Sequence, residues 1–180
     1  MIGLKFEVEP ADYVERVYAG LEPLELARRI SREKAEVVAA KHKDALIIAA
    51  DTFIVLDGQV LGKPHTEKEA RDMLETINGR AHRVITGFSI IDTDTGKTVS
   101  RAVETRVYIK KLSRREINAY VQSGEPGDKA GAYAIQGLGS VIVERIEGDY
   151  FNVIGLPLCA LTKSLKEFGI EVLGGLTGSG

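Results

Sequence analysis

Apolar and polar residues follow two different periods along this chain. Residues 21–42 are rich in Ala, Leu, Glu, Lys and Arg, a composition that favours a helix. The next apolar run, residues 45–50, is typical of a buried strand and ends on a carboxylate, Asp51. The chain continues to Lys63 as a hairpin with Asp57-Gly58 as its turn. The first third therefore predicts a helix, a strand and a tight hairpin.

Two capping boxes predict the starts of later helices. Thr66 and Glu69 form the first, and apolar residues then recur at the helical spacing as far as Asn78-Gly79, namely Ala70, Met73, Leu74 and Ile77. Ser113 and Glu116 form the second, which opens a helix that ends near residue 124. Residues 83–112, between the two helices, predict a long β-hairpin around the polar segment DTDTGK.

The remaining third combines a glycine-rich segment with one strand and one helix. A strand is expected at VIVERI, and Pro157 lies near the start of a helix that ends at Gly169, with one apolar face formed by Leu158, Leu161, Leu165 and Phe168. Strands joined by hairpins, with helices between groups, predict an α+β fold with a mixed sheet rather than a βαβ series. We expect a single domain over residues 1–173 and a flexible tail over 174–180.

Composition narrows the class of protein. With 44% hydrophobic and 28% charged residues, the chain is typical of a globular protein, and no apolar run is long enough to span a membrane. The net charge of −2 leaves no basic excess for a nucleic-acid backbone. The N-terminus lacks a signal-peptide pattern, which indicates the cytoplasm. Cys159, the single cysteine, lies in an apolar stretch and is expected to be a buried structural thiol.

Four charged residues are candidates for a site. Asp51, at the end of an apolar strand, could bind a divalent ion or activate a water, although an aspartate there could also cap a turn. Lys63 lies between a glycine and a proline, a setting suited to a cation directed at phosphate, but surface turns also carry lysines. Lys34 could equally belong to a solvated helix face. Glu15 could be a second metal-binding carboxylate.

The segment GDKAGAYAIQGLGS is more informative. Its glycines indicate a backbone that passes close to another group, and the amide of Gln136 could read a base edge as both donor and acceptor. It is not a Walker A loop, and the chain has no GxGxxG after a strand. His82 could be a general base, but a histidine beside a β-segment is more often structural. No Ser-His-Asp or Cys-His order supports a nucleophilic triad.

Taken together, four blocks resemble the Maf family of nucleoside triphosphate pyrophosphatases over about residues 5–169: AADTFIVLDGQVLGKP, NGRAHRVITG, SGEPGDKAGAYAIQGLGS and RIEGDYFNVIGLPL. The resemblance implies a fold like that of the inosine triphosphate pyrophosphatases, an elongated mixed sheet in two lobes with a nucleotide cleft between them. It also implies hydrolysis of a nucleoside triphosphate to monophosphate and diphosphate with Mg²⁺ or Mn²⁺, and a homodimer.

Roles follow from the motifs that match. The resemblance implies that Asp51 is the catalytic acid, as general base or metal ligand, and that Glu15 is a further acidic residue that contacts metal and substrate, although Val14 stands where the family usually has Asp. It implies that Lys34 and Lys63 contact phosphates and that Gln136 lies at the base. The pair of Thr52 and Gln136 resembles the branch acting on dTTP and UTP.

The resemblance also has a gap at the N-terminus. The family begins with a strand and a Ser-x-Ser-Pro-Arg-Arg loop that grips the triphosphate, whereas MIGLKFEVEP matches sequence just after that region. Two hypotheses follow. The first is an active pyrophosphatase for pyrimidine or modified nucleotides. The second is a catalytically impaired nucleotide-binding or partner-binding protein, associated with septum formation as reported for the family. A missing first strand would also expose a sheet edge.

Overall fold

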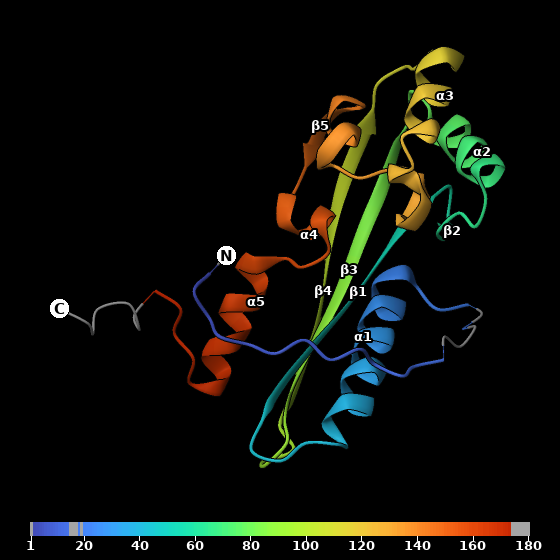
Figure 1. Ribbon diagram of the computed structural model, residues 1–180. Helices are drawn as coiled ribbons and strands as arrows, with labels where there is room; N and C mark the ends of the chain where they lie inside the picture. Colours follow the sequence, from blue (N-terminus) through green and yellow to red (C-terminus); the bar gives the residue numbers. More distant parts are fainter. Residues whose placement is uncertain (1, 15–17, 19, 174–180) are drawn as a thin grey trace.

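The computed structural model describes residues 2–14, 18 and 20–173 (Figure 1). In chain order its elements are α1 (Pro23–Ala39), β1 (Leu46–Leu56), β2 (Gln59–Leu61), α2 (Glu67–Ile77), β3 (Ala81–Asp92), β4 (Thr98–Ile109), α3 (Arg114–Gln122), the 3₁₀ segments η1 (Glu125–Asp128), η2 (Ala130–Ala132) and η3 (Gly137–Val141), β5 (Val143–Glu147), α4 (Tyr150–Ile154), α5 (Leu158–Leu165) and η4 (Lys166–Phe168).

The strands form one elongated sheet in the order β2-β1-β3-β4-β5. Helices and this sheet together confirm the α+β class. Every strand pair of the described sheet is antiparallel, which corrects the expected mixed sheet. Neighbouring strands run in opposite directions because the segments that join them reverse the direction of the chain. β2 pairs only with Ile54–Leu56. Within the described residues, the outer edge of β1 from residue 46 to 53 therefore has no partner strand.

One face of the sheet is covered by α1. Its buried residues recur at the spacing i, i+4, i+8 and i+11, and they are Ala27, Ser31, Ala35 and Val38. Ala27 packs with Phe53, Val55 and Ile85 of the sheet. The approach is very close at Gly87 of β3, where a Cβ would lie 2.0 Å from the Ala27 carbonyl oxygen. A glycine in the strand thus lets α1 lie directly on β3.

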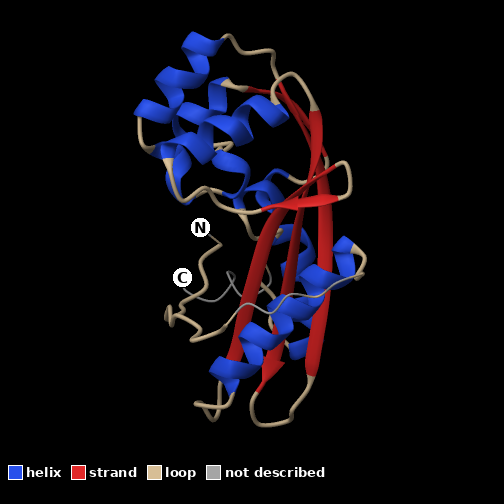
Figure 2. Ribbon diagram, turned by 90° about the vertical axis from the view of Figure 1, so that its right-hand side faces the viewer, coloured by secondary structure: helices blue, strands red, loops and turns tan. Residues whose placement is uncertain are grey.

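The opposite face carries helices at both ends of the long strands, which gives two lobes (Figures 1 and 2). At one end α2 and α3 pack on the sheet around a core that includes Leu74, Ile77 and Ile117. At the other end α5 packs through Leu161 and Leu165 on Phe88 and Ile90. Because side chains of a strand alternate between faces, β1 and β3 contribute to all of these cores at once.

The predicted helix starts are largely confirmed. Ser113 and Glu116 form a complete capping box at α3. At α2 the Thr66 hydroxyl accepts from the Glu69 N–H, but the Glu69 carboxylate accepts from the N–H of His65 instead of that of Thr66 (2.7 Å). The box predicted at Thr66 is therefore only half formed. Gly169, in the left-handed conformation at φ 76°, ends the last helical turn as expected.

In the C-terminal third, one expectation is corrected and one helix is added. Cys159 is exposed rather than buried, because it lies on the outer side of α5 while Leu161 and Leu165 face the core. The five-residue helix α4 was not predicted, since it is too short to show a period; Asp149 caps it by accepting from the N–H groups of Phe151 and Asn152.

The predicted tail, residues 174–180, lies outside the described residues. No described helix has the length and apolarity that a membrane crossing requires.

Candidate active site

A cleft of about 790 Å³ lies where the two lobes meet, along the edge of β1 that has no partner strand among the described residues. Its walls come from α1, from strands β1, β2 and β3, from the β2–α2 connection, from the glycine-rich segment and from α4. Five of the six predicted site residues line it, namely Lys34, Asp51, Thr52, Lys63 and Gln136. The fold thus brings together residues that lie far apart in the sequence.

Lys34 reaches the cleft from a second stripe of α1. Leu26, Ile30 and Lys34 recur every four residues beside the stripe that faces the sheet, and all three line the cleft. The Lys34 ammonium forms an ion pair with the Asp51 carboxylate, and both side chains are about four-fifths buried, with 22% and 17% exposed. Partial burial strengthens this attraction relative to a surface pair. It places a cation and an anion side by side in the cleft.

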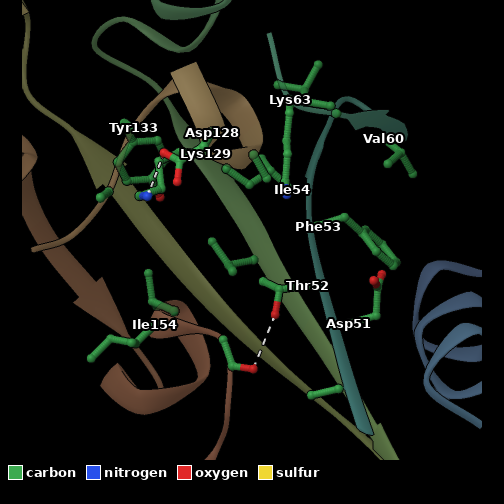
Figure 3. A pocket seen from close by; sticks show the side chains of 18 of the residues that line it. Asp51, Thr52, Phe53, Ile54, Val60, Lys63, Asp128, Lys129, Tyr133 and Ile154 are labelled. Atoms are coloured by element: carbon green, nitrogen blue, oxygen red, sulfur yellow. Dashed lines mark hydrogen bonds and ion pairs between the residues drawn. The ribbon is translucent and has the colours of Figure 1, made fainter. Parts of the chain in front are cut away.

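Asp51 and Thr52 are consecutive, so they point to opposite faces of β1 (Figure 3). Asp51 points toward α1, whereas Thr52 points toward α4. Both line the cleft because it wraps around the strand edge that β2 leaves open. The cleft therefore has a charged side at Asp51 and Lys34 and a largely neutral side at Thr52.

A buried hydrogen-bond network holds Thr52 in place. Its hydroxyl lies 2.8 Å from that of Thr86, and the Thr86 hydroxyl donates to the carbonyl of Asn152 (2.9 Å). Asn152, fully buried, donates through Nδ2 to the Val84 carbonyl and to the Thr105 hydroxyl, both at 3.0 Å. Because this network joins β1, β3, β4 and α4, it fixes the position of α4 against the sheet.

The far end of the cleft is cationic. Lys63 is exposed between Gly62 and the buried Pro64, and the Gly62 carbonyl accepts from the N–H of Gly131 (2.9 Å). This contact brings Lys63 close to the segment of Lys129, which lines the same cleft. The Lys129 ammonium donates to Asp128 (2.6 Å) and lowers the pKa of that carboxyl. Two lysines thus lie at one end of the cleft (Figure 3).

The other predicted residues have different outcomes. Glu15 lies outside the described residues. His82 does not line the cleft; its imidazole is buried, burial lowers its pKa to about 4, and its Nε2 lies 2.7 Å from the Tyr133 hydroxyl. A neutral, enclosed imidazole favours the structural interpretation over the general base. Among the described residues, no group of three or more His, Cys, Asp and Glu side chains could form a metal cage.

Sequence reasoning missed several residues of this site. Asp128 and Tyr133 line the cleft, and Thr86 and Asn152 support it from behind. The threonine and asparagine carry no local signal, because their role depends on pairing between β1 and β3 and on the placement of α4. The block RIEGDYFNVIGLPL contributed only to the resemblance, although its Asp149 could have indicated a helix N-cap.

Comparison with known proteins identifies the family. The family model described as Maf-like protein matches residues 1–168. The chain is 48% identical to the dTTP/UTP pyrophosphatase of Syntrophomonas wolfei over 96% of this chain and 91% of that protein. It is 49% identical to the dTTP/UTP pyrophosphatase of Methanococcoides burtonii over 96% of this chain and 88% of that protein. The expected resemblance is confirmed, and the chain belongs to the Maf family.

Proposed function

We propose that this protein hydrolyses dTTP and UTP to the nucleoside monophosphate and diphosphate. The observation that carries the proposal is the meeting of Lys34, Asp51, Thr52, Lys63 and Gln136 in one cleft between the lobes. The names of the relatives, dTTP/UTP pyrophosphatase, support the choice of substrate. A nucleotide of this kind would find cations for its phosphates at Lys34 and Lys63 and neutral hydrogen-bonding groups for its base at Thr52 and Gln136.

Asp51 is the catalytic residue in this proposal. Its carboxylate accepts a proton from the attacking water, whose oxygen bonds to the α-phosphorus while the bond from that phosphorus to the α–β bridging oxygen breaks. Diphosphate is the leaving group. Lys34 and Lys63 stabilise the negative charge that develops on the phosphate oxygens. Because Lys34 already contacts Asp51, a small rotation of its flexible side chain would move the ammonium from the carboxylate to an incoming phosphate.

The donor set suits a divalent cation held partly by the substrate. Mg²⁺ and Mn²⁺ prefer oxygen ligands, and Mg²⁺ is commonly bound by one or two carboxylates together with substrate phosphates. The carboxylate of Asp51, directed into a cleft with lysines for the phosphates, fits that pattern. We assign Asp51 to the cation, with Glu15 as the second carboxylate. When bound, the cation would offset phosphate charge and acidify water.

The test is diphosphate release with Mg²⁺ or Mn²⁺ from dTTP, UTP, CTP, GTP and methylated GTP. We expect turnover of dTTP and UTP, which chelation of the cation abolishes. Asp51→Asn should lower kcat by about 10²- to 10⁴-fold, because it removes the base but keeps the side-chain shape. Thermal unfolding should show that this variant is folded. A near-normal rate in Asp51→Asn would refute the assignment, and saturable nucleotide binding without turnover in the wild type would favour the nucleotide-binding alternative.

A further inference from the structure

The wall of the cleft that carries Gln136 is a loop held from behind by two side chains. Ala134, Ile135 and Gln136 line the cleft, in a stretch with no long helix or strand of its own. Among the described residues, no hydrogen bond restrains the Gln136 side chain, which is exposed to the cleft. Its placement therefore depends on where the backbone of residues 134–139 runs.

Glu125 binds this backbone on the C-terminal side of Gln136. One oxygen of its carboxylate accepts from the N–H of Leu138, and the other accepts from the N–H of Gly139, both at 2.8 Å. Hydrogen bonds to an ionised acceptor are about twice as strong as neutral ones. The same contacts, together with the Tyr120 hydroxyl, act against the effect of burial and leave the pKa of the Glu125 carboxyl below its usual value.

Tyr120 binds the same backbone on the N-terminal side. Its hydroxyl donates to Glu125 (2.8 Å) and accepts from the N–H of Ala134 (3.2 Å). Burial and the neighbouring carboxylate raise the pKa of this phenol, so it keeps the proton that it donates. Glu125 and Tyr120 are hydrogen-bonded to each other, and together they bind the N–H groups of residues 134, 138 and 139, on both sides of Gln136. We call this pair of side chains the Glu125–Tyr120 clasp.

The clasp also explains the glycines of IQGLGS. A Cβ at Gly137, whose φ is 65°, would lie 2.5 Å from the Glu125 carboxylate. A Cβ at Gly139 would lie 2.5 Å from the Tyr120 hydroxyl and 2.1 Å from the Ala134 carbonyl oxygen. Both glycines are therefore required for the backbone to reach the clasp. The close approach that the sequence indicated is an approach to the protein's own side chains.

We propose that Glu125, acting with Tyr120, is a positioning residue that sets the place of Gln136 in the cleft and thereby the discrimination between bases. The inference rests on the proposed function of Gln136 as the base-reading amide. The clasp touches backbone outside the reacting groups at Asp51 and Lys34, so it governs nucleotide binding and base choice rather than the rate of the bound complex. Glu125→Gln disrupts the clasp. The amide has only one oxygen, so its NH₂ group faces one of the two backbone N–H groups that donate to the carboxylate.

The experiment compares Glu125→Gln and Tyr120→Phe with the wild-type chain. We expect Glu125→Gln to weaken dTTP binding and to reduce the preference for dTTP over dCTP by about tenfold each, while kcat at saturating dTTP changes by less than about threefold. Tyr120→Phe should change the same quantities in the same direction but less, and the double variant should fall short of the product of the two effects because the side chains act as one unit. Hydrogen exchange at Ala134, Leu138 and Gly139 should accelerate in both variants.

Glu116→Gln is the matched control. Its carboxylate also accepts a backbone N–H, that of Ser113 (2.8 Å), in the same lobe, but it does not contact the loop of Gln136. It should lower stability without changing base preference. The proposal is overturned if Glu125→Gln keeps wild-type dTTP affinity and base preference, or if exchange at the three amides is unchanged. If the wild-type chain turns over no nucleotide, calorimetric binding of dTTP and dCTP gives the same comparison, so failure of the proposed reaction is separable from failure of the clasp.

Discussion

At the scale of single residues, the site is organised by the contact between Lys34 and Asp51. This ion pair holds a largely buried cation and a largely buried anion next to each other. The pair therefore preorganises the charged side of the cleft, since each side chain is already held near the place where phosphate and water would arrive. The proposed function gives the lysine a second partner during the reaction, the phosphates.

This arrangement predicts the effect of removing the lysine charge. Lys34→Gln should lower kcat/KM for dTTP by about 10- to 100-fold, the range expected for losing a hydrogen bond to a charged group. Steady-state kinetics of diphosphate release measures it. Arg32→Gln is the control, because Arg32 lies on the same helix but forms an exposed pair with Glu36. A Lys34→Gln variant with an unchanged kcat/KM would show that this lysine does not act on the phosphates.

Individual site residues differed in how far sequence could identify them. Asp51 and Lys63 have distinctive neighbours, an apolar strand on one side of the aspartate and a Gly-x-Pro frame around the lysine. Lys34 has none, because a lysine in a charged helix is ambiguous until the helix is placed on the sheet. Glu125 was missed for a similar reason: its two backbone partners are 13 and 14 residues away in an irregular loop.

At the scale of elements, α1 determines where Lys34 lies, and Gly87 determines how close α1 can come. Composition allowed α1 to be predicted, caps and hydrophobic period allowed α2 and α3, and turn residues and strand alternation allowed the two hairpins, since these signals are local. The position of α1 on β3 depends instead on one glycine that looks in sequence like an ordinary strand residue. The distance between two packed elements is set by the volume of the side chains at the contact. The hydrophobic period of a sequence does not indicate that distance.

Gly87→Ala tests this packing. The added methyl group would overlap the Ala27 backbone, so α1 must move away from the sheet, and the free energy of unfolding should fall by about 2 to 3 kcal/mol. Urea denaturation measures the loss, and dTTP binding should weaken as well because α1 carries Lys34. Gly127→Ala is the control, since nothing lies within 4 Å of the place its methyl group would take and its backbone is not in the left-handed region. Equal stability of the two variants would contradict the close approach.

At the scale of the whole molecule, the sheet joins two lobes whose cores are separate. The class of fold could be predicted because alternating hairpins and helices are visible in the sequence, whereas the all-antiparallel order β2-β1-β3-β4-β5 depends on long-range pairing. Most of the cleft lies at the junction of the lobes. Its shape therefore depends on how the helices of both lobes pack on β1 and β3. Buried polar groups of the fold also couple the stability of the molecule to pH.

His82 provides a measurable case of that coupling. Burial lowers its pKa from 6.5 to about 4, so between these values the unfolded chain binds a proton that the folded chain does not. Its contribution to stability is complete above pH 6.5 and decreases as pH falls toward 4, by about 3 kcal/mol in total. Urea denaturation from pH 7 to 4 should show a flatter dependence in His82→Gln than in the wild type. Parallel curves for the two proteins would contradict a neutral, buried His82.

The alternation of Asp51 and Thr52 on one strand also constrains how this protein can change over evolution. Deleting or inserting a single residue in β1 would move the carboxylate to the α4 side and the hydroxyl to the α1 side, because a strand repeats every two residues. Point substitutions at Thr52 leave Asp51 where it is. Substrate preference can therefore diverge by substitution of Thr52. The length of β1 is held constant, because Asp51 must stay on the face that points toward α1.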